Sequence, residues 1–148
     1  MKSCEMSVGR VFLLRLQTGE VLHEVIEDFA RRNSIRNATL SIVGGADAGS
    51  RLVVGPAVPI TGKIVPHTYV LDAPSEITGT GTLFPDEEGN PIMHMHGSVG
   101  RQGKSVTGCF RSGVVAWLVL EVVITELVGD EPYRKNDPVN GFKILEIE

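Results

Sequence analysis

The chain has 148 residues, of which 42% are hydrophobic and 22% charged, and its net charge is −4. This length predicts one domain over residues 1–148 with a substantial core, while the acidic balance disfavours binding to a phosphate backbone. No apolar signal segment or membrane-spanning stretch is visible, so we expect a cytoplasmic protein that contacts no membrane and keeps its two cysteines reduced.

The first half of the chain predicts one strand followed by one helix. Residues 8–16 alternate as a strand does, and residues 20–32 carry apolar side chains at helical spacing. Thr18 is placed to cap the helix, and Asn33 is placed to end it in a left-handed conformation. His23 falls on the polar side of this helix, where we expect it to be exposed. The apolar stripe should pack on a sheet.

The rest of the chain predicts strands broken by turns. Pro56, Pro59, Gly62 and Pro66 indicate an irregular segment, and Gly44-Gly45 indicates a bulge or a close backbone approach. The expected strands cover residues 38–43, 51–54, 67–71, 76–84, 91–110 (as a hairpin), 114–127 and 141–147.

Two of these strands carry further expectations. Residues 114–127 have little polar interruption, so this strand should be buried on both faces, by a helix and by a subunit interface. Residues 141–147 alternate weakly and suit a sheet edge. Residues 130–140 are expected to be a polar connector, and the few basic residues near Arg134 a solvated loop.

His94 and His96 are the most informative residues of the sequence. Residues two apart on a strand point to the same face, so both imidazoles should project side by side. A turn centred on residues 100–103 pairs positions whose numbers sum to 203, which sets His94 opposite Cys109 and His96 opposite Thr107. Two imidazoles and one thiol would then converge on one face.

The opposite face of this strand carries Met93 and Met95, which are expected in the core. If the hairpin register were shifted by one residue, Cys109 would point to the face of Met93 and Met95, and the three ligands would no longer converge. The alternative is that no metal binds here, and that the two histidines simply lie on the polar face of the strand while Cys109 is a small buried side chain.

Two imidazoles and a thiolate suit zinc. Three protein ligands would leave a fourth position for water or substrate, which is the pattern of catalytic zinc. His67, Asp72 or Glu76 would instead complete a closed, structural site. The sequence does not decide between these two arrangements.

Several segments of the chain together carry a likeness to a known family, and they are residues 11–16 with Gly19-Glu20, 35–44, 76–83, His94-Met95-His96, 107–110 and the tail 137–145. These segments resemble the PPC domain, which is named for plants and prokaryotes, in the form of a stand-alone prokaryotic member. Cys109 stands where prokaryotic members usually carry the histidine of a Gly-Gly-His-Leu motif.

The resemblance implies an α+β fold with a central, largely antiparallel β-sheet and one principal α-helix packed on it, similar in fold to α-acetolactate decarboxylase. It also implies a homotrimer and a zinc site made by His94, His96 and the residue at position 109. Here Cys109 keeps a metal ligand at that position. Plant members carry AT-hook motifs and bind DNA in the nucleus, but this chain has no such motif, so DNA is the least expected partner.

Two functions of different classes follow from the sequence. The first is a metal-dependent enzyme on a small organic molecule, with Glu76 as acid or base and with Arg15 or Arg51 holding a carboxylate. For these three residues, an ordinary surface or interface ion pair is the competing interpretation. The second function is a non-catalytic assembly or binding module. The reaction itself is left open.

Overall fold

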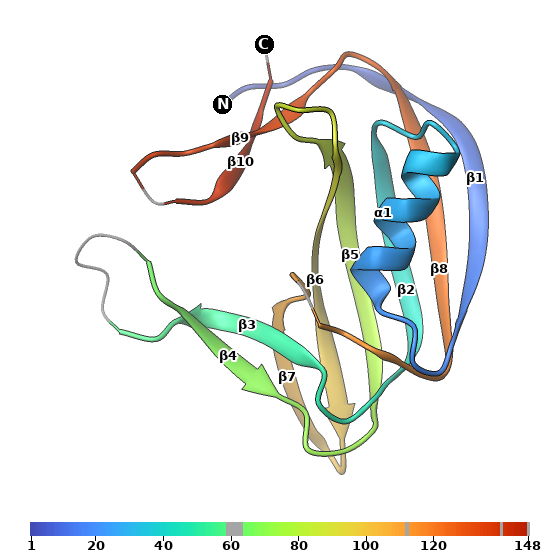
Figure 1. Ribbon diagram of the computed structural model, residues 1–148, viewed down its shortest axis with the longest axis vertical. Coiled ribbons are helices and arrows are strands. Elements are labelled where there is room, and N and C mark those ends of the chain that lie inside the picture. Colours follow the sequence, from blue (N-terminus) through green and yellow to red (C-terminus); the bar gives the residue numbers. More distant parts are fainter. Residues whose placement is uncertain (59–63, 112, 140, 148) are drawn as a thin grey trace.

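The computed structural model describes residues 1–58, 64–111, 113–139 and 141–147, and it consists of one large sheet, one helix and a small C-terminal hairpin (Figure 1). Pro59 and Gly62, expected in an irregular segment, lie outside the described residues. The elements are β1 (Met6–Gln17), α1 (Leu22–Arg32), β2 (Ala38–Ala46), β3 (Arg51–Pro56), β4 (Pro66–Val70), β5 (Ser75–Pro85), β6 (Pro91–Arg101), β7 (Lys104–Cys109), β8 (Ala116–Gly129), β9 (Tyr133–Asn136) and β10 (Lys143–Glu146).

The large sheet has eight strands in the order β1-β8-β2-β5-β6-β7-β3-β4, and each neighbouring pair is antiparallel. The prediction of an α+β fold with a largely antiparallel sheet and one helix is confirmed. In Figure 1, α1 lies over β2 and β8, while the β3–β4 and β9–β10 hairpins lie on the side of the molecule away from β1. None of the described helical residues form a segment long and apolar enough to cross a membrane.

The helix begins later than predicted and without the predicted cap. Val21 is the N-cap residue and makes no side-chain capping bond. Thr18 does not cap α1, because its hydroxyl accepts a hydrogen bond from the backbone N–H of Leu118 instead (2.9 Å). Thr18 therefore ties the loop before the helix to β8.

The helix ends in a left-handed residue, but at Ser34 and not at Asn33. Ser34 has a φ of 54°, whereas Asn33 has a φ of −102°. The Asn33 side chain instead donates a hydrogen bond to the carbonyl of Phe29 (2.9 Å), which satisfies one of the last carbonyls of the helix. The prediction for Asn33 was thus wrong by one residue.

The core lies between α1 and the face of the sheet that α1 covers. Leu22, Ile26 and Ala30 form the buried stripe of the helix, as its periodicity predicted. The predicted core residues Met93 and Met95 of β6 are both buried. His23 is only half-exposed, with a buried Nδ1 that has no partner among the described residues, so its predicted exposure was wrong.

The outer face of the sheet is open in the single chain. Along β8, Leu120, Val122 and Ile124 are buried beneath α1, but Val119 on the other face is exposed. The expected burial of β8 on both faces therefore requires a partner that covers the outer face.

The predicted irregularity at Gly44-Gly45 is confirmed as a bulge between β2 and β8. The register shifts between Gly44 and Gly45, and Leu118 on β8 takes a left-handed φ of 57°. A Cβ at Gly44 would lie 2.2 Å from the carbonyl oxygen of Val119, so only glycine permits this approach.

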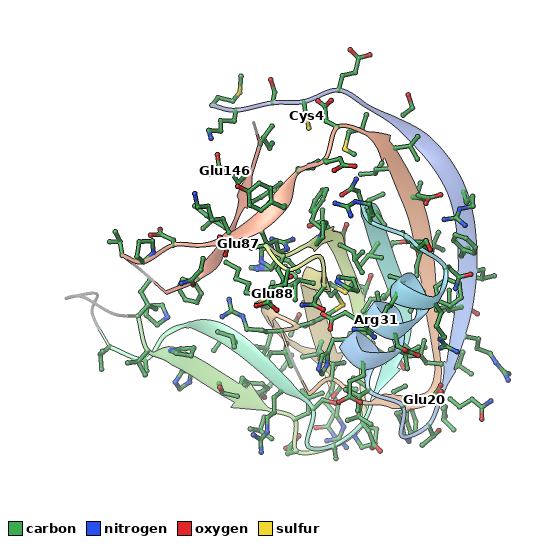
Figure 2. The ribbon with its side chains drawn as sticks, turned by 45° about the horizontal axis from the view of Figure 1, so that its top comes forward. Cys4, Glu20, Arg31, Glu87, Glu88 and Glu146 are labelled. Atoms are coloured by element: carbon green, nitrogen blue, oxygen red, sulfur yellow. The ribbon has the colours of Figure 1, made fainter. Side chains whose placement is uncertain are left out.

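The C-terminal segment forms a hairpin of its own, in place of the predicted connector and edge strand. β9 pairs with β10 in a separate two-stranded sheet, and Arg134 of β9 also forms an isolated parallel bridge with Asp86. Lys143 pairs with the buried Asp86 (2.8 Å), and Glu87, labelled in Figure 2, accepts a hydrogen bond from the Asn136 N–H (3.3 Å). The hairpin is thus anchored on the β5–β6 turn, while Glu146 pairs with Lys2 at the N-terminus (Figure 2).

The β6–β7 hairpin has a different register from the predicted one. Cys109 pairs with His96, not with His94, and Arg101 pairs with Lys104. The turn residues between them, Gln102 and Gly103, both have positive φ angles (52° and 74°), as a two-residue hairpin turn requires. The slip is by two residues, and side chains repeat every two residues, so Cys109 keeps its predicted face.

The stability of the fold should depend on pH through Glu126. Its buried carboxylate accepts bonds from the Arg10 side chain (2.7 Å for both) and from the Arg10 N–H (3.1 Å) at a bulge in β1. These bonds lower the pKa of Glu126. The stabilisation is therefore present above the ordinary glutamate pKa and is lost as pH falls through the lowered one.

Replacing Glu126→Gln should accordingly destabilise the protein at pH 7 and less at pH 3, as measured by urea unfolding. Asp28→Asn, which removes an exposed pair with Arg32 (2.7 Å), serves as the control and should have a small effect. A destabilisation by Glu126→Gln that is the same at both pH values would contradict this role.

Gly97 should be irreplaceable, because the buried Phe110 ring fills the space of its missing side chain. A Cβ at Gly97 would lie 2.3 Å from the Thr78 carbonyl oxygen and 2.5 Å from the Phe110 ring. We expect Gly97→Ala to destabilise the protein by about 1–3 kcal/mol in urea unfolding. Gly100→Ala on the same strand is the matched control, since its Cβ would approach nothing closer than 3.8 Å. Equal stability of the two variants would contradict the packing argument.

Candidate metal centre

His94, His96 and Cys109 converge on one face of the sheet, as the sequence predicted. Their ligand atoms all lie within 4.8 Å of one another. The two Nε2 atoms are 3.2 Å apart, and the rings meet edge to face at 84°. The convergence arises because His94 and His96 alternate with the buried Met93 and Met95, so both imidazoles point away from α1.

Cys109 reaches the cluster from the last position of β7. It lies directly opposite His96 on β6 and opposite Val53 on β3, so strands on both sides fix its backbone. Its side chain is buried, whereas both histidines are exposed. The cluster is therefore closed on the sulfur side and open on the imidazole side.

The environment keeps His94 neutral. Partial burial of its ring lowers the pKa of the imidazole, and electrostatic interactions with Arg134, His96 and Arg111 lower that pKa further. A neutral imidazole offers a lone pair to a metal ion, whereas a protonated one does not. At neutral pH, His94 is thus in the form that binds metal.

Arg134 of β9 lies beside the cluster and is only 4% exposed. It donates hydrogen bonds to the hydroxyl of Thr82 (2.9 Å) and to the carbonyl of Ile92 (3.4 Å). Burial lowers the pKa of Arg134, while the nearby Cys109 sulfur raises it. An arginine stays charged even so, and its positive charge therefore lies close to the sulfur.

A cavity of about 580 Å³ adjoins the cluster, between β6 and the C-terminal hairpin. His94 is part of its wall, together with Arg111, Arg134 and apolar side chains of both segments. Its volume is in the usual range for small-molecule sites. A molecule held in this cavity would therefore lie next to an imidazole of the cluster.

The structure does not bring Glu76, Arg15 or Arg51 to the cluster. Glu76 pairs with Gly100, four residues from His96, which corresponds to roughly 13 Å along a strand. Arg15 lies on β1, four strands away from β6. Arg51 begins β3 but does not line the cavity. Their catalytic and substrate-binding roles remain predictions without geometric support.

Sequence reasoning did not predict that Arg134 and Arg111 lie beside His94 in the cavity wall. Arg134 was assigned to a solvated loop, and this was wrong because β9 carries its side chain back onto the β5–β6 pair. The available signal was the turn sequence Asp137-Pro138 between two short segments of strand length, which is typical of a hairpin.

Comparisons with known proteins agree with this fold. A metal-containing protein from Archaeoglobus fulgidus is 27% identical, and the two structures superpose over 99% of this chain and 100% of the other with a TM-score of 0.81. A plant- and prokaryote-conserved (PPC) protein from Pyrococcus horikoshii shares the fold at 23% identity, over 99% of this chain and 100% of its own, with a TM-score of 0.78.

A curated relative is much longer than this chain. The bifunctional protein GlmU from Synechococcus sp. (strain JA-3-3Ab) is 28% identical over 142 residues, which are 94% of this chain but only 21% of that protein. The profile of the Plants and Prokaryotes Conserved (PCC) domain, also written PPC, matches residues 4–128. Because this match covers most of the sequence, the chain belongs to the Plants and Prokaryotes Conserved domain family.

Proposed function

We propose that this protein binds one zinc ion through His94, His96 and Cys109 and acts, as a homotrimer, on a small organic molecule. The observation that carries the proposal is the convergence of these three ligand atoms within 4.8 Å. The metal content of the Archaeoglobus fulgidus protein supports it, since that protein shares the fold and 27% of the sequence.

The separation of the two imidazole nitrogens fits zinc. Ligand nitrogens about 2.0–2.1 Å from a tetrahedral zinc are about 3.3 Å apart, and the two Nε2 atoms here are separated by 3.2 Å. Two imidazoles and one thiolate are ligands that zinc accepts in catalytic sites. The same two atoms also have the separation of a hydrogen bond, so zinc uptake must be measured.

An ion with three protein ligands keeps a fourth position for water or substrate, where zinc polarises a carbonyl or activates water. The residues of the chain supply the rest of the site. His94 is the cluster residue that lines the cavity, and apolar side chains form much of the remaining wall. Arg134 lies close to the Cys109 sulfur and also lines the cavity. The reaction on the bound molecule stays undefined.

Zinc uptake should require all three ligands. We expect one zinc per chain in protein refilled with zinc, measured by elemental analysis after dialysis. His96→Ala and Cys109→Ala should each weaken binding by more than the roughly 10–100-fold that loss of an outer partner costs. His67→Ala and Cys4→Ala are the matched controls, because neither residue belongs to the cluster. Full occupancy in Cys109→Ala would contradict the ligand assignment.

The homotrimer is supported by the open outer face of the sheet. Several apolar side chains on this face are exposed, and exposed apolar surface on a sheet marks an interaction site. Four of them, between 41% and 72% exposed, are Val11, Leu13, Val43 and Val119. A neighbouring subunit on this face would also provide the second covered side that the apolar sequence of β8 predicts.

Leu13→Asp should break the trimer. We expect wild-type protein to have a mass of about 48 kDa by light scattering after size exclusion, three times the 16.0 kDa of one chain, and the variant to have the mass of one chain. Val139→Asp is the control, since Val139 is equally exposed but lies outside the sheet. A monomeric wild type, or an unchanged trimer in Leu13→Asp, would contradict the interface.

The alternative function is a non-catalytic assembly or binding module. The exposed apolar side chains on the outer face of the sheet favour this alternative independently of the metal. A trimer that takes up no zinc would support the non-catalytic module over the enzyme. DNA binding ranks last because the net charge is −4. The cytoplasmic location and the likeness in fold to α-acetolactate decarboxylase stay predictions.

A further inference from the structure

The buried guanidinium of Arg134 has only neutral hydrogen-bond partners. Its bonds go to the Thr82 hydroxyl and the Ile92 carbonyl, and no carboxylate of the described residues forms an ion pair with it. A charge removed from water is costly unless an opposite charge compensates it. Arg134 is therefore a site of unmet positive charge in the wall of the cavity.

Arg111 adds a second cation to the same cavity. Its guanidinium lies over the Phe142 ring, 4.8 Å from the centroid, and it likewise has no ion pair with a described carboxylate. Lys143 also lines the cavity, but Asp86 already neutralises it (2.8 Å). Two arginines thus face the cavity without a counter-ion.

The sulfur of Cys109 does not supply the missing negative charge once zinc is bound. The two charges of the ion outweigh the single charge of one thiolate and two neutral imidazoles, so the cluster becomes a cation itself. Three positive centres would then surround the cavity. This arrangement favours an anionic ligand over a neutral one.

The remaining cavity wall is apolar. Four apolar residues contribute hydrocarbon surface to the same wall as the charged groups: Ile92, Phe142, Ile144 and Leu145. A ligand that satisfies both parts needs a compact negative group at one end and a carbon chain at the other. Inorganic phosphate satisfies only the charged part, and a neutral alcohol only the apolar part.

We infer that the cavity binds a small carboxylic acid with a short apolar chain, whose carboxylate is held by Arg134 and Arg111 beside the metal cluster. This inference rests on the proposed function, because it names the class of molecule that the zinc site acts on. A guanidinium offers paired donors that match the two oxygens of a carboxylate. The residues differ from Arg15 and Arg51, which the sequence suggested for the same task.

The probe is hexanoate, titrated calorimetrically into zinc-loaded protein, with hexan-1-ol and inorganic phosphate as matched ligands. We expect hexanoate to bind once per chain at about millimolar concentration or tighter, and more tightly than either matched ligand. Arg134→Gln should weaken hexanoate binding about tenfold or more. Arg111→Gln should weaken it in the same direction, and Arg111 is exposed, so this variant leaves the fold intact. Arg101→Gln, in the β6–β7 hairpin and outside the cavity, should bind like wild type.

Three results would overturn the inference. These are no hexanoate binding by zinc-loaded protein, hexan-1-ol or phosphate binding as tightly as hexanoate, and unchanged hexanoate affinity in Arg111→Gln. If Arg134 only holds the C-terminal hairpin in place, Arg134→Gln would weaken hexanoate binding while Arg111→Gln would leave the hexanoate affinity unchanged.

The same titration with metal-free protein separates this inference from the proposed function. Arginine-dependent hexanoate binding in a protein that takes up no zinc would support the anion site and refute the metal site. Zinc uptake by the three ligands without hexanoate binding would support the metal site and refute the anion site.

Discussion

The pairing of β6 with β7 is the constraint on which the rest of this structure depends. It sets Cys109 opposite His96, and the two-residue turn at Gln102-Gly103 fixes that register through two left-handed residues. Side chains of β6 alternate between the two faces of the sheet. Met93 and Met95 are therefore buried in the core, whereas the imidazoles of His94 and His96 point away from it. The core side chains beneath α1 and the side chains of the ligand cluster thus lie on opposite faces of the same strand. A change in the register of β6 would displace both sets of side chains.

The C-terminal hairpin gives this rigid cluster its surroundings. β9 and β10 do not join the large sheet, yet the Lys143–Asp86 pair and the Arg134–Thr82 bond hold them against β5 and β6. The cavity exists only because this hairpin lies beside β6. The family match covers residues 4–128, so this hairpin lies beyond it and contributes Arg134, whereas Arg111 lies within the matched region. Changes in the sequence of this hairpin would alter the cavity wall, so proteins with similar sheets could bind different ligands.

Local sequence pattern predicted the strands, the helix and the convergence of His94, His96 and Cys109, because period-two alternation and the helical stripe are local properties. It failed where the outcome depended on distant contacts. Thr18 binds the backbone of Leu118 one hundred residues away in preference to capping α1. The predicted register of the β6–β7 hairpin was wrong, because the sequence of residues 100–103 allows two turn positions. The site was still predicted, because the displacement of two residues leaves Cys109 on the same face. Arg134 could not be assigned, because its burial arises from packing of one hairpin on another pair of strands.

The central claim is that two imidazoles and one thiolate hold a single zinc ion on the outer face of this sheet. X-ray absorption at the zinc edge measures this directly on the loaded protein. We predict one sulfur at about 2.3 Å and nitrogen or oxygen ligands at about 2.0–2.1 Å, two of them with the outer-shell scattering of imidazole. A spectrum with no sulfur in the first coordination shell would contradict the site.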